Sequence, residues 1–311
     1  MKIKKPTFWD YKKPNFLSYL LLPFSLPIII NNFFLNLKKN GKNNQEIKNI
    51  CIGNIYIGGT AKTPLSIKID QILKNLNFKT ATIKKFYKDQ TDEQKILSKK
   101  TKLYCFETRQ KALNEAIKDR IEVAIFDDGL QDRSINYDLR FVCFNNITWI
   151  GNGLLIPAGP LRESLRSILK YDAIFLNGND ENNSQLKSKI REYNKDIEIF
   201  ETYYKPINIK EFDKNDKYLI FSGIGNPDSF KKTLIKNELH IIKEFKFPDH
   251  HNYTFKDINK IKLAAKILDA KILTTEKDYV KLHNDVEIKF LEIELAIKQE
   301  NRLINFLKSK I

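Results

Sequence analysis

Cysteine and histidine are scarce in this sequence. The three cysteines, Cys51, Cys105 and Cys143, lack the short spacing of metal-binding pairs, and each falls in a stretch that predicts a core strand. We interpret them as small buried apolar residues of a protein kept in a reducing compartment. Two of the four histidines, His250 and His251, are adjacent. Neighbouring histidines rarely face one ion, so no metal site is expected there.

Acidic residues are outnumbered by basic ones. The chain has 54 Lys and Arg against 38 Asp and Glu, for a formal net charge of +16. Such an excess favours anionic partners, namely nucleic acid, phosphorylated ligands or an acidic lipid surface. The chain lacks an aromatic-and-basic recognition motif, so we expect no nucleic-acid partner. Its 311 residues, of which 42% are hydrophobic, suffice for a large α/β unit with an appended lobe.

The N-terminus is apolar but lacks an uninterrupted membrane-spanning run. Residues 15–37 are mostly apolar and follow a basic segment at 1–13. No small-residue cleavage site comes after them, which argues against a secretory signal. A spanning helix needs about 20 predominantly apolar residues, and two prolines and an Asn-Asn pair interrupt this run. We favour a helix that lies in the membrane interface. The alternative is a helix packed on the protein's own core.

The central feature of the chain is residues 49–64, which predict a strand, a glycine turn and a helix that opens on Lys62 and Thr63. The N–H groups of such a turn and the helix dipole favour an anion at one point. Lys62 adds a positive charge for the outer phosphates, and Thr63 offers a hydroxyl to Mg²⁺. The strict P-loop sequence pattern, G-x-x-x-x-G-K-[ST], requires glycine at the positions of Tyr56 and Ala61. Taken alone, the stretch is equally consistent with an ordinary strand–helix connection.

A second signal follows at residues 123–131. Four apolar residues precede Asp127 and Asp128, which predicts a buried parallel strand that ends in two carboxylates. Ligands bind at the carboxyl ends of strands in open α/β sheets, and a carboxylate there holds Mg²⁺ directly or through water. A turn with an aspartate at a helix N-cap is the alternative. Together with the glycine turn, the pair favours a P-loop protein that binds a nucleotide.

The rest of the chain contains a shaped loop and a stretch that predicts the start of a second lobe. Residues 151–163 hold three glycines and two prolines and end in Arg162 and Glu163. These two are suited to a phosphate and a metal, or else to a surface ion pair or helix cap. A polar, charged stretch at 205–216 predicts a boundary. We therefore expect three parts, which are an N-terminal membrane-associated segment with its linker (1–45), a P-loop core (46–210) and a C-terminal α/β lobe (211–311).

Several motifs, taken together and in this order, resemble one family, the tetraacyldisaccharide 4'-kinases of lipid A biosynthesis. The Pro-Ala-Gly-Pro-Leu-Arg-Glu and Phe-Pro-Asp-His-His stretches are far more specific than a phosphate loop. The motifs span most of the chain, and they lie at residues 53–54 with 58–64, 127–131, 151–163, 223–227, 247–251 and 275–278.

The resemblance implies a P-loop NTPase-like α/β fold. Its mostly parallel sheet would be flanked by helices, with a smaller C-terminal α/β lobe and an N-terminal membrane-associated helix. The implied enzyme transfers the γ-phosphoryl group of ATP to the 4'-hydroxyl of a tetraacyldisaccharide 1-phosphate, with ATP and Mg²⁺ as cofactors. Its partners would be this phosphorylated glycolipid and the inner-membrane surface, at the cytoplasmic face. No protein partner is identified.

The resemblance also suggests roles for particular residues. Asp92 is the candidate base and His250 its partner; a carboxylate would mainly align the hydroxyl and take its proton late. Lys62 would neutralise charge that develops on the phosphates. The candidate metal ligands are Thr63, Asp127, Asp128 and Glu163. The candidate nucleotide contacts are the turn and two arginines: Tyr56, Ile57, Gly58, Gly59, Thr60, Ala61, Lys62, Thr63, Arg109 and Arg162.

The chain departs from the family pattern at three places. Ala61 occupies the position of a glycine in the family's phosphate loop. Its methyl group there either crowds the phosphates or is tolerated if φ stays negative. Residues 84–87 replace a Ser-Arg-Gly-Tyr-Gly stretch of the family, and Asp132 occupies a position where the family usually has histidine. These departures bear on substrate contacts and rate more than on fold. A different class of protein, a membrane-tethered P-loop ATPase or switch that acts through a protein partner, would have no use for Asp92 and His250.

Overall fold

Contacts divide the chain into two compact units. The structure is a computed structural model that describes residues 5–37, 46–88, 91–178, 183–282 and 285–311. Unit 1 comprises Met1–Phe86, Thr101–Tyr203 and Leu295–Ile311. Unit 2 comprises Tyr87–Lys100 and Tyr204–Glu294.

This division differs from the three consecutive parts expected from composition. Residues 87–100 belong to unit 2 and residues 295–311 to unit 1, while the N-terminal segment belongs to unit 1 rather than standing apart. A polar stretch in the sequence marks one boundary. It does not reveal that a helix and the C-terminus return to a distant part of the chain.

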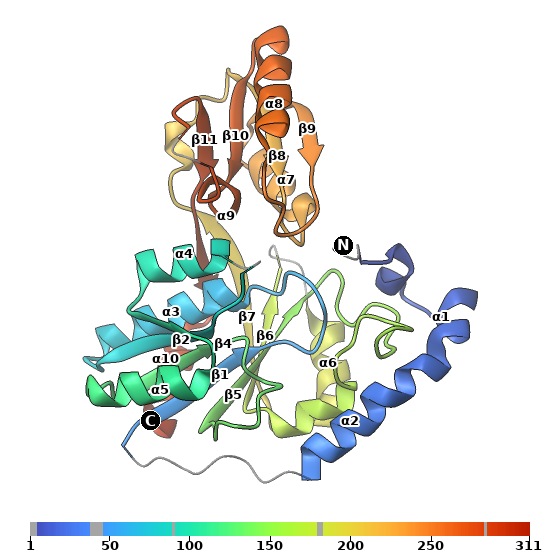
Figure 1. Cartoon of the computed structure of the whole chain (residues 1–311), viewed down its shortest axis with the longest axis vertical. Helices are drawn as coiled ribbons and strands as arrows, with labels where there is room; N and C mark the ends of the chain where they lie inside the picture. Colours follow the sequence, from blue (N-terminus) through green and yellow to red (C-terminus); the bar gives the residue numbers. More distant parts are fainter. Residues whose placement is uncertain (1–4, 38–45, 89–90, 179–182, 283–284) are drawn as a thin grey trace. The chain divides into compact units, whose positions relative to one another are not determined.

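Unit 1 is built around an eight-stranded sheet with the order β12-β7-β6-β5-β1-β4-β2-β3 (Figure 1). Neighbouring strands from β7 to β3 are all parallel, so the predicted mostly parallel sheet is confirmed. The strands are β1 (Lys48–Gly53), β2 (Thr80–Lys85), β3 (Leu103–Phe106), β4 (Val123–Asp127), β5 (Leu139–Asn145), β6 (Ala173–Asn177), β7 (Glu198–Pro206) and β12 (Ile293–Ile297). β4 is buried along its whole length, as expected of a strand in a sheet covered on both faces.

The helices of unit 1 follow the strands. They are α3 (Lys62–Asn75), α5 (Arg109–Lys118), α6 (Ser184–Tyr193) and α10 (Glu300–Lys310), with a 3₁₀ helix, η3, at Leu165–Lys170. The buried residues of α3 include Leu65, Ile69, Ile72 and Leu73, which recur with a helical period. Through this face α3 packs against β1, β2 and β4. The packing holds the first turn of α3, and with it Lys62 and Thr63, beside the central strands.

Unit 2 has its own parallel sheet, with the order β11-β10-β8-β9. Its strands are β8 (Lys217–Ser222), β9 (His240–Lys246), β10 (Lys271–Thr275) and β11 (Ile288–Leu291). Its helices are α4 (Thr91–Lys100), α7 (Pro227–Lys236), α8 (Phe255–Leu268) and α9 (Glu276–Tyr279), with a 3₁₀ helix, η4, at Ile209–Glu211. Thr254 and Asp257 form a reciprocal capping box at the start of α8. The glycine turn at 223–225 leads from β8 into α7.

The N-terminal segment folds into short helices along unit 1 (Figure 1). They are the 3₁₀ helices η1 (Thr7–Asp10) and η2 (Leu22–Ser25) and the α-helices α1 (Phe16–Leu21) and α2 (Leu26–Leu37). Polar contacts attach the segment to the loop before η3. Trp9 Nε1 donates to the Pro157 carbonyl at 3.0 Å, and Ser25 Oγ donates to the Leu155 carbonyl at 3.0 Å.

The opposite side of this segment is apolar and exposed. Phe16 is 79% exposed and Phe24 66%. The stretch Phe16–Phe34 has the length and mean hydropathy (1.5) of a candidate membrane span, and only 11% of its most apolar window is buried. A helix packed on the protein's own core would be mostly buried, so the exposure favours the interfacial interpretation over that alternative.

Candidate functional site

The phosphate loop, residues 54–61, joins the end of β1 to α3. The buried side chain of Asn54 holds it in shape, because Nδ2 donates to the Tyr56 carbonyl at 2.6 Å and to Thr60 Oγ1 at 3.0 Å. Gly58 has a φ of 148°, a conformation that a residue with a Cβ rarely adopts. The loop is therefore shaped by an internal amide and one glycine.

Backbone donors collect at this loop. The N–H groups of residues 58–63 have no acceptor among the residues that the structure describes. The Ile57 N–H differs, since it donates to the Pro160 carbonyl at 2.9 Å. Unpaired N–H groups at a glycine turn and a helix N-terminus form a site for an anion such as phosphate. The donors open to a ligand thus begin at Gly58, and Tyr56 and Ile57 precede them.

The Tyr56 side chain contacts the N-terminal segment. Its hydroxyl contacts Asp10 and accepts from Lys5 Nζ at 2.9 Å. Burial, followed by the bond to Asp10, raises the pKa of Tyr56. The predicted cradle residue Tyr56 therefore ties the loop to the N-terminal segment.

Ala61 adopts a left-handed backbone conformation, with φ 67° and ψ 25°, at the N-cap of α3. From the sequence, the methyl group of Ala61 was expected to be tolerated if φ is negative. The observed φ is positive, so this condition is not met. An L-residue other than glycine in this region is strained by about 1–2 kcal/mol. The buried loop and the packing of α3 hold Ala61 there despite the strain.

Replacing Ala61 by glycine is expected to stabilise the protein by about 0.5–1 kcal/mol, because relief of the strain exceeds the extra freedom of the unfolded chain. Equilibrium unfolding in urea measures the change. The control is Ala112→Gly in the buried interior of α5, which should destabilise by about 1 kcal/mol. Equal destabilisation by both variants would contradict the strain at Ala61.

Lys62 and Arg162 converge on one carboxylate. Lys62 Nζ lies 3.8 Å from Asp128 Oδ1, and Arg162 Nη1 lies 3.3 Å from the same oxygen. Asp128 itself has a φ of 60° at the end of β4. Two cations beside one carboxylate leave a net positive charge near the unpaired N–H groups, which favours a phosphate ligand.

Asp127, at the end of β4, is completely buried. Its Oδ2 accepts from Thr63 Oγ1 at 3.0 Å and from Lys84 Nζ at 2.6 Å. Its Oδ1 accepts from Ser66 Oγ at 3.2 Å. The structure thus brings together two of the predicted metal ligands, Thr63 and Asp127, together with a lysine that the sequence analysis did not assign to the site.

Two further candidate residues, the metal ligand Glu163 and the nucleotide contact Arg109, are held by protein partners. Glu163 is buried, and its Oε1 accepts from Gln131 Nε2 at 3.0 Å while Oε2 accepts from the Tyr171 hydroxyl at 3.3 Å. Arg109 is also buried; it donates to Asp132 Oδ2 at 3.0 Å and to the Asp128 carbonyl. In this structure Arg109 therefore supports the turn that carries Asp128.

Asp132 accounts for the orientation of Arg109. Burial alone would raise the pKa of Asp132, but hydrogen bonds from Ser134 and Arg109 lower it below its usual range. The departure from the family pattern at this position is therefore an ionised carboxylate that contacts a buried arginine.

In unit 2, Asp92 and His250 are in contact although 158 residues separate them. His250 Nδ1 lies 3.1 Å from both carboxylate oxygens of Asp92. Asp92 is in the first turn of α4, where the helix dipole favours a negative charge. His250 has a φ of 56°, and its N–H donates to the Gly223 carbonyl at 3.1 Å. The second glycine turn thus positions His250.

Two lysines complete the surroundings of Asp92. Lys281 Nζ lies 3.4 Å and Lys277 Nζ 3.9 Å from Asp92 Oδ2. Burial alone would raise the pKa of Asp92, but the hydrogen bond from His250 and the charge of Lys277 lower it to about 2. Burial alone would lower the pKa of Lys277, but the nearby carboxylates of Asp249, Glu93 and Asp92 raise it above its usual value. Asp92 is consequently a carboxylate across the physiological pH range.

Sequence reasoning did not assign Lys84 to the surroundings of Asp127, nor Lys277 to the surroundings of Asp92. Lys84 follows the β-branched residues Thr80, Thr82 and Ile83, which are typical of a strand. A charge in such a stretch is a signal that could have identified it. Lys277 lies in a motif that carried the resemblance but received no role. Ser66 follows Thr63 by three residues, which places both on one face of α3.

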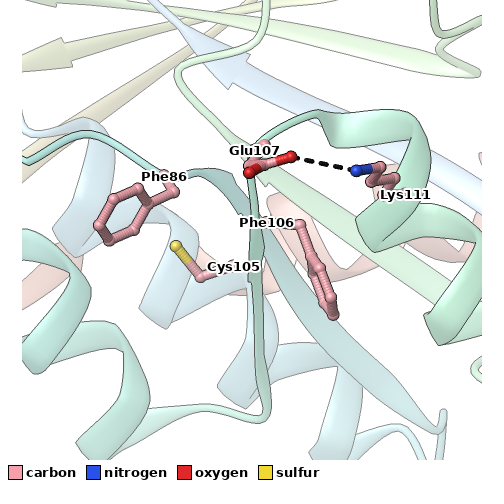
Figure 2. A pocket seen from close by; sticks show the side chains of 5 residues that line it. All are labelled: Phe86, Cys105, Phe106, Glu107 and Lys111. Atoms are coloured by element: carbon pink, nitrogen blue, oxygen red, sulfur yellow. Dashed lines mark hydrogen bonds and ion pairs between the residues drawn. The ribbon is translucent and has the colours of Figure 1, made fainter.

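A separate cavity of about 390 Å³ lies at the carboxyl ends of β2 and β3. Figure 2 shows the lining side chains, with the ion pair between Glu107 and Lys111; they are Phe86, Cys105, Phe106, Glu107 and Lys111. None of the predicted site residues lines it. The cavity and the phosphate loop are therefore distinct features of unit 1.

The parallel sheet, the loop with unpaired N–H groups and the carboxylates at the end of β4 define a P-loop protein of the kinase class. A family model described as tetraacyldisaccharide-1-P 4'-kinase matches residues 17–103 and 85–311. The chain belongs to this family, and it is therefore a kinase, as the motifs predicted.

Individual relatives agree with this membership. The chain is 52% identical over 308 residues to the tetraacyldisaccharide 4'-kinase of Pelagibacter ubique (strain HTCC1062), covering 98% of this chain and 97% of the relative. It is 34% identical over 324 residues to that of Rickettsia canadensis (strain McKiel), covering 97% and 96%. A solved structure of LpxK from Aquifex aeolicus in complex with ATP has a TM-score of 0.70 at 23% identity and covers 94% of this chain and 99% of its own. This last comparison supports the fold.

Proposed function

We propose that this kinase transfers the γ-phosphoryl group of ATP to the 4'-hydroxyl of a tetraacyldisaccharide 1-phosphate. The observation that carries the proposal is the set of unpaired N–H groups at residues 58–63, beside Lys62 and the Thr63–Asp127 pair. Such a set binds the β- and γ-phosphates of a nucleotide. The acceptor and the position phosphorylated come from family membership.

Within unit 1, we assign ATP to the loop from Gly58 to Thr63. Lys62 would neutralise charge on the transferred phosphoryl group, and Arg162 would add a second donor to phosphate. Tyr56, Ile57 and Arg109 would support the loop and the Asp128 turn without touching the nucleotide. This is a narrower set of contacts than the sequence suggested.

The residues fit a magnesium ion. Mg²⁺ takes oxygen ligands and is usually bound by one or two carboxylates together with substrate phosphates and water. Thr63 with Asp127 or Asp128 offers such oxygens, with Glu163 as a more distant candidate. No three His, Cys, Asp or Glu side chains in the described part of the chain converge on a metal position. When bound, a magnesium ion would neutralise charge on the phosphates.

Within unit 2, we assign Asp92 as the group that aligns the 4'-hydroxyl and takes its proton. A carboxylate whose pKa is about 2 is a weak base, so its contribution lies in orientation and in accepting the proton late. His250 fixes the carboxylate through Nδ1. A P-loop ATPase or switch has no need of this pair, so the pair favours the kinase over that alternative.

One assay tests the proposal. The protein is incubated with γ-³²P-labelled ATP, Mg²⁺ and tetraacyldisaccharide 1-phosphate in detergent micelles, and the labelled lipid is separated by thin-layer chromatography. We expect label on the disaccharide, at the 4'-position by mass spectrometry. ATP hydrolysis without labelled lipid would instead favour the ATPase.

We further propose that the N-terminal segment attaches the enzyme to the cytoplasmic face of the inner membrane, where ATP and the glycolipid meet. The support is the exposed apolar side of α1, η2 and α2, together with the basic net charge of the chain. An amphipathic segment of this kind lies in the interface and is attracted by anionic lipid.

Substituting Phe16 and Phe24 by serine is expected to weaken binding to anionic vesicles by about tenfold or more, because two exposed aromatic side chains lose their contact with lipid. Co-sedimentation with phosphatidylglycerol-containing vesicles measures the change. The control replaces Ile147 and Leu169, which are also exposed (50% and 63%) and lie in unit 1 outside this segment. Unchanged binding in the phenylalanine variant would exclude the segment as the anchor.

A further inference from the structure

Lys84 is a buried charge at the phosphate site. It lies in β2, which pairs with β4 on one side and β3 on the other, and only 1% of it is exposed. Its Nζ lies 2.6 Å from Asp127 Oδ2. A lysine is rarely buried to this extent unless it meets a carboxylate. The contact is therefore a fixed part of the sheet and not a chance surface ion pair.

The contact with Lys84 leaves Asp127 with both oxygens engaged. Oδ2 accepts from Lys84 Nζ and from Thr63 Oγ1, and Oδ1 accepts from Ser66 Oγ. A hydroxyl group has one hydrogen and two lone pairs. Because the Thr63 hydrogen is directed to Asp127, the lone pairs of Thr63 Oγ1 are left for a ligand. Asp127 thus orients the Thr63 oxygen.

This site rests on the ATP-binding function proposed above and refines it. We propose that Lys84 is the permanent counter-ion of Asp127 and keeps divalent metal off that carboxylate, so that the metal of the nucleotide complex binds Thr63 Oγ1 and Asp128. Lys84 is then a positioning residue, which acts on the metal through Asp127.

Electrostatics separates the two carboxylates. A divalent ion bound directly to Asp127 would have to approach a buried ammonium group that already contacts the same carboxylate, and like charges repel strongly where water is excluded. Asp128 is more accessible, since 19% of its side chain is exposed, and its contacts with Lys62 and Arg162 are longer at 3.8 and 3.3 Å. Longer, partly solvated contacts are more easily exchanged when phosphate and metal arrive together.

The test measures metal affinity rather than turnover. Mn²⁺ is titrated into the protein with a saturating non-hydrolysable ATP analogue, adenylyl imidodiphosphate, and free Mn²⁺ is followed by electron paramagnetic resonance. The variants are Lys84→Met, Asp128→Asn and the charge-balanced pair Lys84→Met with Asp127→Asn. Lys85→Met is the matched control, because it makes the same substitution at the next residue, whose side chain leaves the opposite face of β2.

We expect Asp128→Asn to weaken Mn²⁺ binding at least tenfold and the Lys84/Asp127 double variant to change it less than threefold. Lys84→Met alone should tighten Mn²⁺ binding at least threefold, since Asp127 becomes open to the metal. A further variant, Lys84→Arg, keeps the positive charge and should keep the wild-type affinity. Lys85→Met should match the wild type. Thermal unfolding of each variant confirms that it is folded; the double variant keeps the site neutral if Lys84→Met is unstable.

Two results would overturn the inference while leaving the proposed function intact. One is a tenfold or greater loss of Mn²⁺ affinity in the Lys84/Asp127 double variant, which would make Asp127 a direct ligand. The other is wild-type affinity in a folded Lys84→Met protein. Failure of the wild type to bind the nucleotide analogue would overturn the proposed function, and this inference with it.

Discussion

Lys62→Ala is expected to lower kcat/KM for phosphoryl transfer by about a thousandfold, the size of effect found when a charge that stabilises a transferred phosphoryl group is removed. Lys62 stands at the first position of α3, beside N–H groups that have no acceptor among the described residues. In the transition state, charge spreads over the phosphoryl oxygens, and a preorganised ammonium group costs no reorganisation at that moment. Backbone N–H groups remain in the variant, so nucleotide affinity should fall less than the rate.

The assay is transfer of ³²P to the disaccharide, with nucleotide affinity measured separately by calorimetry. Lys118→Ala is the matched control, because it removes the same charge from an exposed position, with 69% of the side chain accessible. Thermal unfolding checks that loss of the Lys62 contact with Asp128 has not unfolded unit 1. A folded Lys62→Ala protein with more than a tenth of wild-type kcat/KM would remove Lys62 from catalysis.

Local patterns predicted the elements that position the site. The glycine turn before Lys62 and Thr63 predicted the start of α3, and the apolar run before Asp127 predicted β4. These predictions succeed because the signals lie in neighbouring residues of a single element. The grouping of helices and strands into two units was harder to predict from the sequence. The reason is that α4 joins unit 2 through contacts with α9, some 180 residues later in the chain.

The pairing of distant side chains was the less accessible part of the site. Asp92 and His250 were associated only through the family resemblance, since no local pattern links residues so far apart. The sign of φ at Ala61 depends on the packing of the whole loop. Arg109 was expected at a phosphate from the family resemblance, and its sequence neighbours do not reveal Asp132 as its partner. The burial of Lys84 follows from the order of strands, which places β2 inside the sheet.

Asp92 also makes stability depend on pH in a defined direction. Its pKa in the folded protein, about 2, lies below the value of about 4 expected in the unfolded chain. The ionised carboxylate therefore stabilises the fold above pH about 4, by about 2 kcal/mol, and this contribution is lost as the pH falls through about 2. Asp92→Asn should accordingly unfold more easily than the wild type at pH 7, and the difference should shrink in acid.

Asp92→Asn is expected to lower kcat by about 10²- to 10⁴-fold with little change in the KM for ATP, because the amide aligns the acceptor hydroxyl poorly and cannot take its proton. His250→Ala should have a smaller effect of the same kind, since it removes the group that fixes the carboxylate. Unit 2 provides a matched control in His251, whose Nε2 lies 3.1 Å from Asp257 Oδ2 in a pair of the same chemistry. His251→Ala should leave kcat within about threefold of the wild type.

The pH–rate profile distinguishes catalysis from structure. With a pKa of about 2, Asp92 is ionised at every pH at which the enzyme is assayed, so it does not supply the acid limb of the profile. Asp92→Asn should therefore lower the whole profile without moving that limb. A folded Asp92→Asn protein with wild-type kcat would leave the kinase assignment standing but exclude Asp92 as the base. A shifted acid limb would mean that the Asp92 carboxylate titrates much nearer neutrality than its contacts with His250, Lys277 and Lys281 allow.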